Sequence, residues 1–290
     1  MEQRENTEKK KPGKKCDIIT ILIIIALIVA AAAIAACVVM TRQNHQSEDE
    51  YGEMASQYLK DDDNNSGMGD DTTEIPTSEG SGQPAHTESG TDRTPVTSLI
   101  PQAPDVDFAG LQKKGKDIVA WISIPSLGIE YPVVQTDNNE DYLHVTAYGS
   151  RYYAGSIILE AVNSKAFTDA NTILYGHNMS NGSMFGKLTT LHENTSREPI
   201  YIWICTPENK YLYRVISEYV TDMYGEAYRM FSSKDTPEDV AKWISGIAGK
   251  SSTGFDMPPA YIKRVLTLST CTSASDRTRH VVQAVMIGRG

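Results

Sequence analysis

A cysteine, a histidine and an arginine lie at or near the ends of three predicted strands. The stretch Thr267 to Cys271 is a strand that ends on the cysteine, and Arg279 lies near the start of the next strand, Thr278 to Met286. An earlier strand, Thr172 to His177, ends on the histidine. A short turn between the last two strands would form a hairpin and set Arg279 beside Cys271. A thiol, an imidazole and a guanidinium are the groups that covalent acyl transfer needs.

The chemistries of these three side chains complement one another. A free thiol has a pKa of about 8.5 and is only a few per cent ionised at neutral pH, so a cysteine nucleophile needs a base or a cation nearby. His177 could fill either role, and it could also protonate a leaving amine. Arg279 stays protonated and could stabilise an oxyanion. Taken singly, each residue also has a structural explanation: a packed thiol, a turn histidine and a solvated edge arginine.

The N-terminal region contains a segment that is long enough to cross a membrane. Ile18 to Met40 has no charged residue, and a bilayer-spanning helix needs about 20 apolar residues. Lysines cluster before this segment, between residues 9 and 15, whereas Arg42 is the nearest base behind it. Because lysine and arginine stay on the cytoplasmic side, we expect residues 1–17 to be a cytoplasmic basic tail and the chain after Thr41 to lie outside the cell.

Two alternatives exist for this segment. A cleaved signal peptide has an apolar region of about 7–15 residues, which is shorter than Ile18 to Met40. Ile34 to Cys37 resembles the processing site of a bacterial lipoprotein, but the apolar run continues past Cys37. The length favours an uncleaved transmembrane signal-anchor at 18–40, which would contact membrane lipid.

The acidic charge of the chain is concentrated in one segment. The whole chain carries a formal charge of −10, and residues 41–104 carry thirteen acidic and three basic side chains. This segment is also rich in Ser, Thr, Gly and Pro, so we predict an extracellular, largely disordered linker, with a short helix over Glu50 to Lys60 as a possible element. Residues 105–290 carry twenty acidic and eighteen basic side chains. Such a balance argues against a nucleic-acid partner.

Residues 105–290 suffice for one domain with its own core. Short runs of β-branched and aromatic residues alternate with turn residues there, which is typical of an antiparallel barrel or sandwich. The expected strands are 119–124, 129–134, 155–159, 171–175, 200–205, 211–219, 262–270 and 278–287.

Helices and a second cysteine complete the expected domain. Thr236 can cap a helix that continues to Ala248, with Pro237 at its first position and one apolar face. A shorter helix is expected at Asp107 to Lys114. Cys205 ends an apolar strand and is expected to be a packed core thiol rather than a disulfide partner of Cys271, because free cysteine is among the most buried residue types.

Several motifs, in this order along the chain, resemble those of the sortases, the cysteine transpeptidases of Gram-positive cell envelopes. They are residues 174–179 (Leu-Tyr-Gly-His-Asn-Met) and residues 267–271 with Arg279 downstream. Residues 118–135, residues 148–157 and the helix at 236–248 resemble class B members in particular. The resemblance runs from about residue 107 to the end of the sequence. It implies a mainly β domain, a closed eight-stranded antiparallel sortase-type β-barrel with peripheral helices, at 105–290.

The resemblance also implies a role for each member of the trio. Cys271 would be the nucleophile, His177 the general acid and base, and Arg279 the group that stabilises the oxyanion or positions the substrate. Arg277 is the alternative for the arginine. We favour Arg279 because it directly precedes the strand core at Val281, which fits a residue carried by a strand.

The activity that the resemblance implies is a membrane-anchored transpeptidation. The enzyme would cleave a C-terminal sorting motif of secreted surface proteins after a threonine, form a thioacyl-enzyme, and transfer the protein to an amine of peptidoglycan or its precursor. It would need no cofactor, and no acidic loop suggests a calcium site. One alternative is a cysteine endopeptidase in which water resolves the intermediate. Another is a non-catalytic barrel that binds wall peptides. The client proteins, such as haem-uptake proteins or pilins, are not specified by the sequence.

Overall fold

The computed structural model describes residues 18–60, 100–193, 198–250, 263–272 and 277–290. The chain divides into two compact units, with the boundary after Gln46. The second unit contains the barrel and every candidate site residue.

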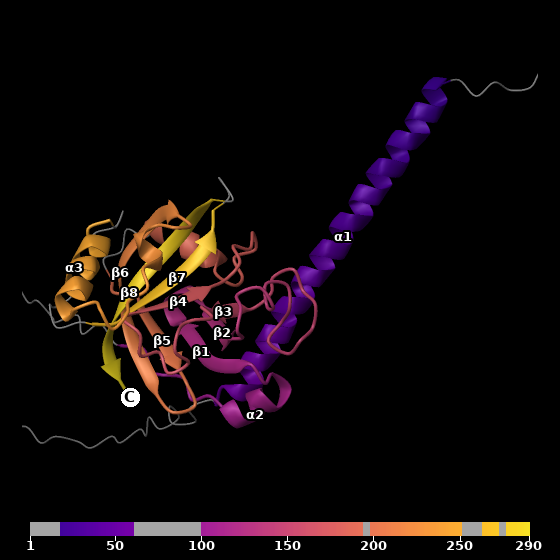
Figure 1. Cartoon of the computed structure of the whole chain (residues 1–290). Helices are drawn as coiled ribbons and strands as arrows, with labels where there is room; N and C mark the ends of the chain where they lie inside the picture. The colour runs from indigo at the N-terminus through magenta and orange to yellow at the C-terminus, as the bar shows by residue number, and fades with distance from the viewer. Residues whose placement is uncertain (1–17, 61–99, 194–197, 251–262, 273–276) are drawn as a thin grey trace, which may run out of the picture. The chain divides into compact units, whose positions relative to one another are not determined.

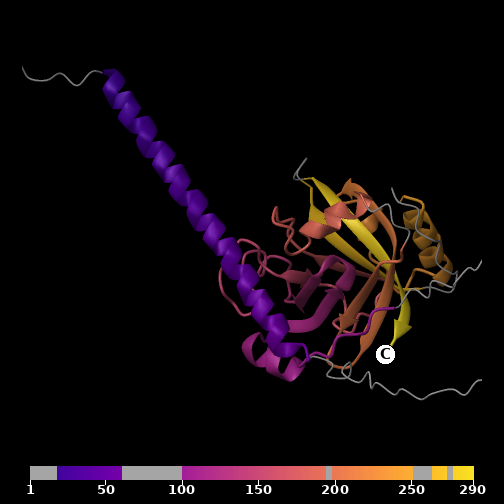
Figure 2. The ribbon, with the colours of Figure 1, turned by 180° about the vertical axis from the view of Figure 1, so that it is seen from behind.

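Eight strands form a closed barrel, which confirms the predicted architecture (Figure 1). Their order around the barrel is β1-β2-β3-β4-β7-β8-β6-β5. The C-terminus is marked in Figure 2. There the backbone N–H of Gly290 donates a 2.8 Å hydrogen bond to the carbonyl oxygen of Lys210. The strands are β1 (Ile118–Ile124), β2 (Ile129–Val134), β3 (Ile157–Leu159), β4 (Asn171–Tyr175), β5 (Tyr201–Cys205), β6 (Lys210–Asp222), β7 (Val265–Cys271) and β8 (Thr278–Arg289).

Two of the strand pairs are parallel, which corrects the expectation of a wholly antiparallel barrel. Strand β2 pairs with β3, and β4 pairs with β7, in parallel. Parallel neighbours need a long crossover between them, since a tight hairpin can join only antiparallel strands. The chain supplies such crossovers: strands β5 and β6 and a helix intervene between β4 and β7. The parallel β4–β7 pair brings the carboxyl ends of these two strands to the same edge of the barrel.

The core of the barrel unit is mainly apolar, with a few paired polar groups. Trp121 is fully buried, and its indole Nε1 donates a 2.8 Å hydrogen bond to Glu130. Cys205 is also buried and forms no disulfide, as predicted. Its Sγ lies 3.6 Å from the carbonyl oxygen of Pro104. Burial raises the pKa of the Cys205 thiol to about 12, so this cysteine is an inert part of the core.

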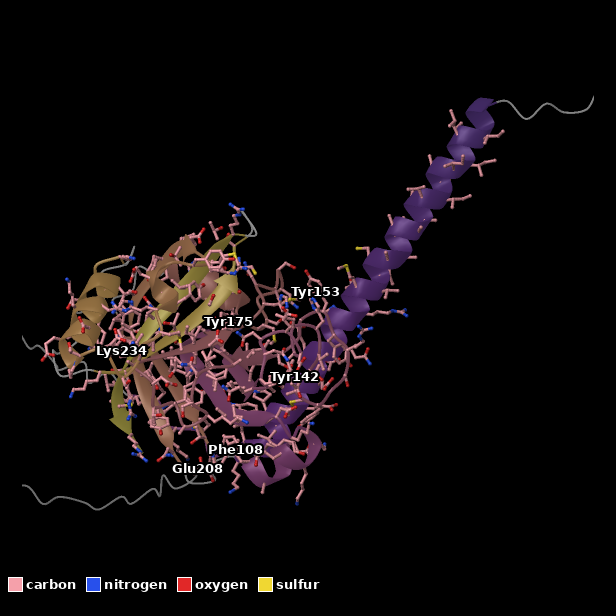
Figure 3. All side chains as sticks on the ribbon, viewed as in Figure 1. Phe108, Tyr142, Tyr153, Tyr175, Glu208 and Lys234 are labelled. Atoms are coloured by element: carbon pink, nitrogen blue, oxygen red, sulfur yellow. The ribbon has the colours of Figure 1, made fainter. Side chains whose placement is uncertain are left out.

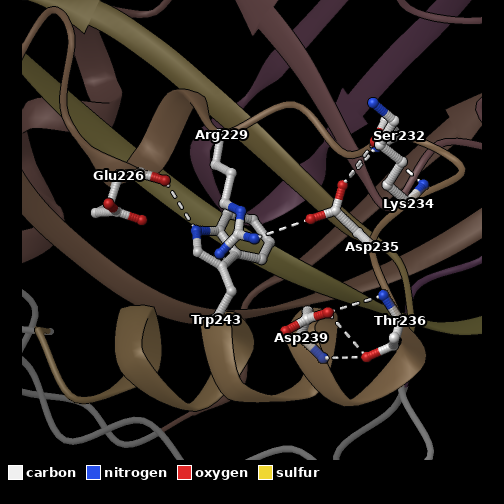
Figure 4. Close-up of polar contacts among 8 residues, drawn as sticks. All are labelled: Glu226, Arg229, Ser232, Lys234, Asp235, Thr236, Asp239 and Trp243. Carbon is white, nitrogen blue, oxygen red and sulfur yellow. Dashed lines mark hydrogen bonds and ion pairs between the residues drawn. The ribbon is translucent and has the colours of Figure 1, made fainter.

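The predicted helices at 107–114 and 236–248 are both present. In α2 (Phe108–Lys114), the side chain of Asp107 accepts a hydrogen bond from the backbone of Gly110. In α3 (Pro237–Ala248), Thr236 and Asp239 form a reciprocal capping box (Figure 4). The apolar face of α3 packs against Ile216, Val265 and Val285 of the barrel wall.

The N-terminal helix is longer than the predicted membrane segment. Helix α1 runs without a break from Ile18 to Tyr58, so the start of the predicted linker at 41–104 is helical. Within it, Ile21–Arg42 is long and apolar enough to span a membrane. Tyr51, Met54 and Tyr58 are buried in the core of the barrel unit. Their spacing places them on one side of the helix, where they form a short apolar stripe. The residues around this stripe are acidic and polar, which is why the sequence suggested a linker. Residues 61–99 of that linker lie outside the described residues.

The packing of α1 gives a stability prediction. Met54 is 1% exposed, so Met54→Ala in the full chain, kept in detergent, should lower the free energy of unfolding by about 2–5 kcal/mol. Urea unfolding followed by tryptophan fluorescence measures this change. Glu53→Ala, at an exposed position on the same helix, is the control and should change the stability by less than about 0.5 kcal/mol. Equal effects of the two substitutions would contradict the packing of α1 on the barrel.

Candidate active site

The parallel pairing of β4 and β7 brings His177 and Cys271 together. The last residue pair in the register of β4 and β7 is Tyr175 with Ser269. His177 and Cys271 each lie two residues after their member of this pair. The contact continues past the strands: Gly176 donates its backbone N–H to Ser269 and accepts a 2.7 Å hydrogen bond from Thr270 Oγ1. Asn178 then donates a 2.9 Å hydrogen bond from Nδ2 to the carbonyl oxygen of Cys271. These bonds hold the two strand ends side by side.

The antiparallel pairing of β7 and β8 adds the arginine. Cys271 and Arg279 are direct partners in the register of the two strands. Arg277 lies in the turn before β8, and it is exposed. Its carbonyl oxygen accepts a hydrogen bond from the backbone of Met223. The structure therefore matches the sequence-based distinction between a strand-borne Arg279 and a turn-borne Arg277.

All three candidate residues line one open groove. The groove has a volume of about 330 Å³, and Cys271 is exposed at its surface. Tyr175, visible with Tyr153 in Figure 3, lies in the wall of the groove. Most of the lining is neutral. Among the described residues its charged groups are Glu160 and Arg279, besides the titratable His177 and Cys271.

The imidazole of His177 is held from several sides. Its Nε2 lies 2.9 Å from the carbonyl oxygen of Leu143. Because a carbonyl only accepts, Nε2 carries a proton, and in the neutral ring Nδ1 is then the basic nitrogen. The ring of His144 stacks on His177 with centroids 5.3 Å apart, and the ring of Tyr153 lies 5.8 Å away. This setting fixes both the tautomer and the orientation of the ring.

Burial lowers the pKa of His177 below its ordinary value of 6.5, and the neighbouring His144 adds to the effect. The hydrogen bond to Leu143 acts in the opposite direction and is the weaker influence. At neutral pH the imidazole is therefore mainly neutral, which is the form that can accept a proton from a thiol.

The structure adds two tyrosines that the sequence reasoning missed. Tyr228 lies in the short helix η3 (Glu226–Tyr228), and its ring stacks on Tyr175 with centroids 6.5 Å apart. Its hydroxyl lies 2.7 Å from Ser269 Oγ, two residues before the cysteine. Tyr175 donates a 2.7 Å hydrogen bond to Glu160. The positive charge of Arg279 acts on the hydroxyls of both tyrosines, opposing the rise of their pKa on burial. Nothing in the sequence marks Tyr228, because it reaches the groove from a distant loop.

The sequence also suggests two further segments as walls of the groove, the apolar face of the helix at 236–248 and the turn at 257–260. The apolar face of α3 does not line it, because that face is buried against the barrel. Instead, α3 supports η3 from outside: Trp243 Nε1 donates a 2.8 Å hydrogen bond to the carbonyl oxygen of Glu226 (Figure 4). The turn at 257–260 lies outside the described residues.

Comparisons with known proteins agree with the fold and the motifs. The family model for the sortase domain matches residues 122–287. Sortase B of Listeria monocytogenes is 31% identical over 189 residues, covering 62% of this chain and 74% of that protein. Sortase B of Staphylococcus aureus is 31% identical over 182 residues, with the same coverage. A solved complex of Staphylococcus aureus sortase B with its substrate is 30% identical, with a TM-score of 0.54, and the match covers 62% of this chain and 84% of that one.

The environment of His177 predicts its titration. In the full chain, the imidazole should titrate with a midpoint below 6.5, because burial penalises its charged form. Below pH 6.5 the unfolded chain would bind a proton that the folded chain does not, so the contribution of this group to stability should fall as the pH decreases. NMR of the ring resonances, assigned with His177→Asn, measures the midpoint, and the urea-unfolded chain gives the reference. A folded-state midpoint at or above the reference would contradict the prediction.

Proposed function

This chain belongs to the sortase family of cysteine transpeptidases, and we propose from that premise that Cys271, His177 and Arg279 perform the transfer on sorting motifs of secreted surface proteins. The observation that carries this proposal is the shared groove, which three different segments line with a thiol, a histidine and an arginine. The activity of the family supplies the reaction class, and the groove supplies the residues.

In the first step, Cys271 attacks a peptide carbonyl of the bound sorting motif. The neutral His177 takes the thiol proton, and the sulfur forms a bond to the carbonyl carbon of the residue before the scissile bond, which we propose is threonine. The carbonyl oxygen gains a negative charge, and the guanidinium of Arg279 stabilises it. As this intermediate collapses, the C–N bond breaks and the imidazolium gives its proton to the leaving amine. The product is a thioester on Cys271.

In the second step, an amine resolves the thioester. We propose that this amine belongs to peptidoglycan or its precursor. His177 accepts a proton from the amine as the new C–N bond forms, and the C–S bond breaks. The sulfur leaves as a thiolate and takes back the proton. Both steps use His177 in two protonation states, and a lowered pKa keeps the required neutral form abundant at neutral pH.

Helix α1 supports a proposal for the location of the enzyme. We propose that Ile18 to Met40 anchors the protein in the cell membrane through contact with lipid. The N-terminus would be cytoplasmic, and the barrel would lie outside, near the cell wall. The apolar span Ile21–Arg42 supports the anchor, and the lysines before it support the orientation.

A library of sorting peptides, given to the full chain in detergent, tests the proposed substrate. Mass spectrometry should find an acyl adduct on Cys271, and its mass reads the residue before the scissile bond. Adding an amine acceptor such as a diamino-acid peptide or triglycine should convert the adduct into a ligated product. Products of hydrolysis alone, with every acceptor, would favour the endopeptidase instead. Cys271→Ala should give neither an adduct nor a product.

The two arginines give a matched pair of variants. Arg279→Lys keeps the charge but loses the planar fork of donors, so kcat/KM should fall by about 10²–10³, as for the loss of an oxyanion-hole donor. Arg277→Lys, in the exposed turn, should keep kcat/KM within about twofold. Steady-state kinetics with a fluorogenic sorting peptide measures both variants. The opposite ranking would assign the catalytic role to Arg277.

A further inference from the structure

Two loops control the position of the His177 imidazole. The first, residues 142–156, supplies the Leu143 carbonyl oxygen that accepts from Nε2, together with the stacked rings of His144 and Tyr153. The second, residues 178–185, begins directly after His177 and returns to it, since the backbone N–H of Phe185 donates a 3.0 Å hydrogen bond to the His177 carbonyl oxygen. The orientation of the ring therefore depends on what holds these loops.

The last turns of α1 hold the first loop. Tyr51 is 4% exposed, and its hydroxyl donates a 2.6 Å hydrogen bond to the carbonyl oxygen of Gly155 and lies 3.1 Å from Ser156 Oγ. The end of this loop is tied to its start, because the backbone N–H of Ser156 donates a hydrogen bond to the carbonyl oxygen of Tyr142. Glu50 adds a second contact, in which it accepts a 2.8 Å hydrogen bond from Thr146.

The contact between Gly155 and Leu143 makes this support specific. Gly155 has a φ of +57°, and a Cβ at this position would clash with the backbone of Leu143. Gly155, whose carbonyl oxygen accepts from Tyr51, is thus packed against the backbone of Leu143. The carbonyl oxygen of Leu143 in turn orients His177. A shift of Gly155 would be transmitted to Leu143 because no space separates their backbones.

The same helix also holds the second loop. Glu48 accepts a 2.7 Å hydrogen bond from Asn181 Nδ2. The rings of Tyr51 and Tyr131 pack edge to face with centroids 5.2 Å apart. The Tyr131 hydroxyl accepts a 3.0 Å hydrogen bond from the backbone N–H of Met184. Tyr51 is therefore a common support for both loops, one through its hydroxyl and the other through its ring.

We propose that Tyr51 is a positioning residue for the transfer reaction, through which the end of α1 sets the orientation of the His177 imidazole. The inference rests on the proposed role of His177 as general acid and base. It assigns a part in the reaction to a helix that precedes the barrel and that, among the described residues, contributes none to the groove.

The variant Tyr51→Phe tests this inference in the full chain, because it keeps the packed ring and removes only the hydroxyl. We expect kcat to fall about tenfold with KM changed less than about twofold, as for a small misplacement of a catalytic group. The acid limb of the kcat profile should also move up toward pH 6.5, since a loosened loop admits water to an imidazole whose pKa is lowered chiefly by burial. Glu48→Ala should act in the same direction with a smaller effect.

Tyr211→Phe is the matched control. Tyr211 is also buried, at 1% exposure, and its hydroxyl donates a 2.9 Å hydrogen bond to the carbonyl oxygen of Ala166. Neither residue lies in the two loops or lines the groove. A purely structural role for Tyr51 would reduce the fraction of folded enzyme, counted by alkylation of Cys271, without changing kcat per active site or the acid limb. That result, or equal effects of Tyr51→Phe and Tyr211→Phe, would overturn the inference. If His177→Asn were fully active, the proposed function itself would fail, whatever Tyr51→Phe does.

Discussion

The parallel pairing of β4 with β7 is the constraint on which the site depends. Parallel strands end at the same edge of a sheet, so one pairing carries both His177 and Cys271 to a common point although they lie far apart in the sequence. The neighbouring β7–β8 pair then sets Arg279 opposite Cys271. Neither pairing alone assembles the trio. The site is therefore built from strand ends, and the closed barrel fixes their relative positions through backbone hydrogen bonds.

A buried polar residue ties this pairing to the groove wall. Asn171, at the start of β4, accepts a 2.7 Å hydrogen bond from Thr267 of β7. Its amide Nδ2 donates to the carbonyl oxygens of Ala227 and Arg229, which flank Tyr228. Leaving a buried amide unpaired costs more than its hydrogen bonds contribute, so this arrangement of hydrogen bonds resists displacement. That arrangement holds Tyr228 against Tyr175 and Ser269, beside the cysteine.

The sequence predicted local features of the site and could not predict the assembly. The strand end at Cys271, the hairpin with Arg279 and the cap at Thr236 follow from short-range patterns. The strand predicted to end at His177 ends two residues earlier, at Tyr175. The adjacency of β4 and β7 does not, because strand order is decided by packing among segments distant in the chain. Tyr228 and Leu143 reach the site from loops, for which periodicity gives no signal. The burial of Tyr51 was missed for a similar reason. A short apolar stripe in an acidic segment can be identified as a buried helix face only when the surface that it packs against is known.

A cross-link between the two strand ends tests this account most directly. Neighbouring strands lie about 4.8 Å apart, and a disulfide joins residues whose Cα atoms are about 4.4–6.8 Å apart. The side chains at 177 and 271 both line the groove, so His177→Cys in the full chain should form a disulfide with Cys271 under mild oxidation. Peptide mapping by mass spectrometry should recover one linked peptide that joins positions 177 and 271. Recovery of Cys271 linked to Cys205, or of both groove cysteines unlinked after oxidation, would contradict the pairing.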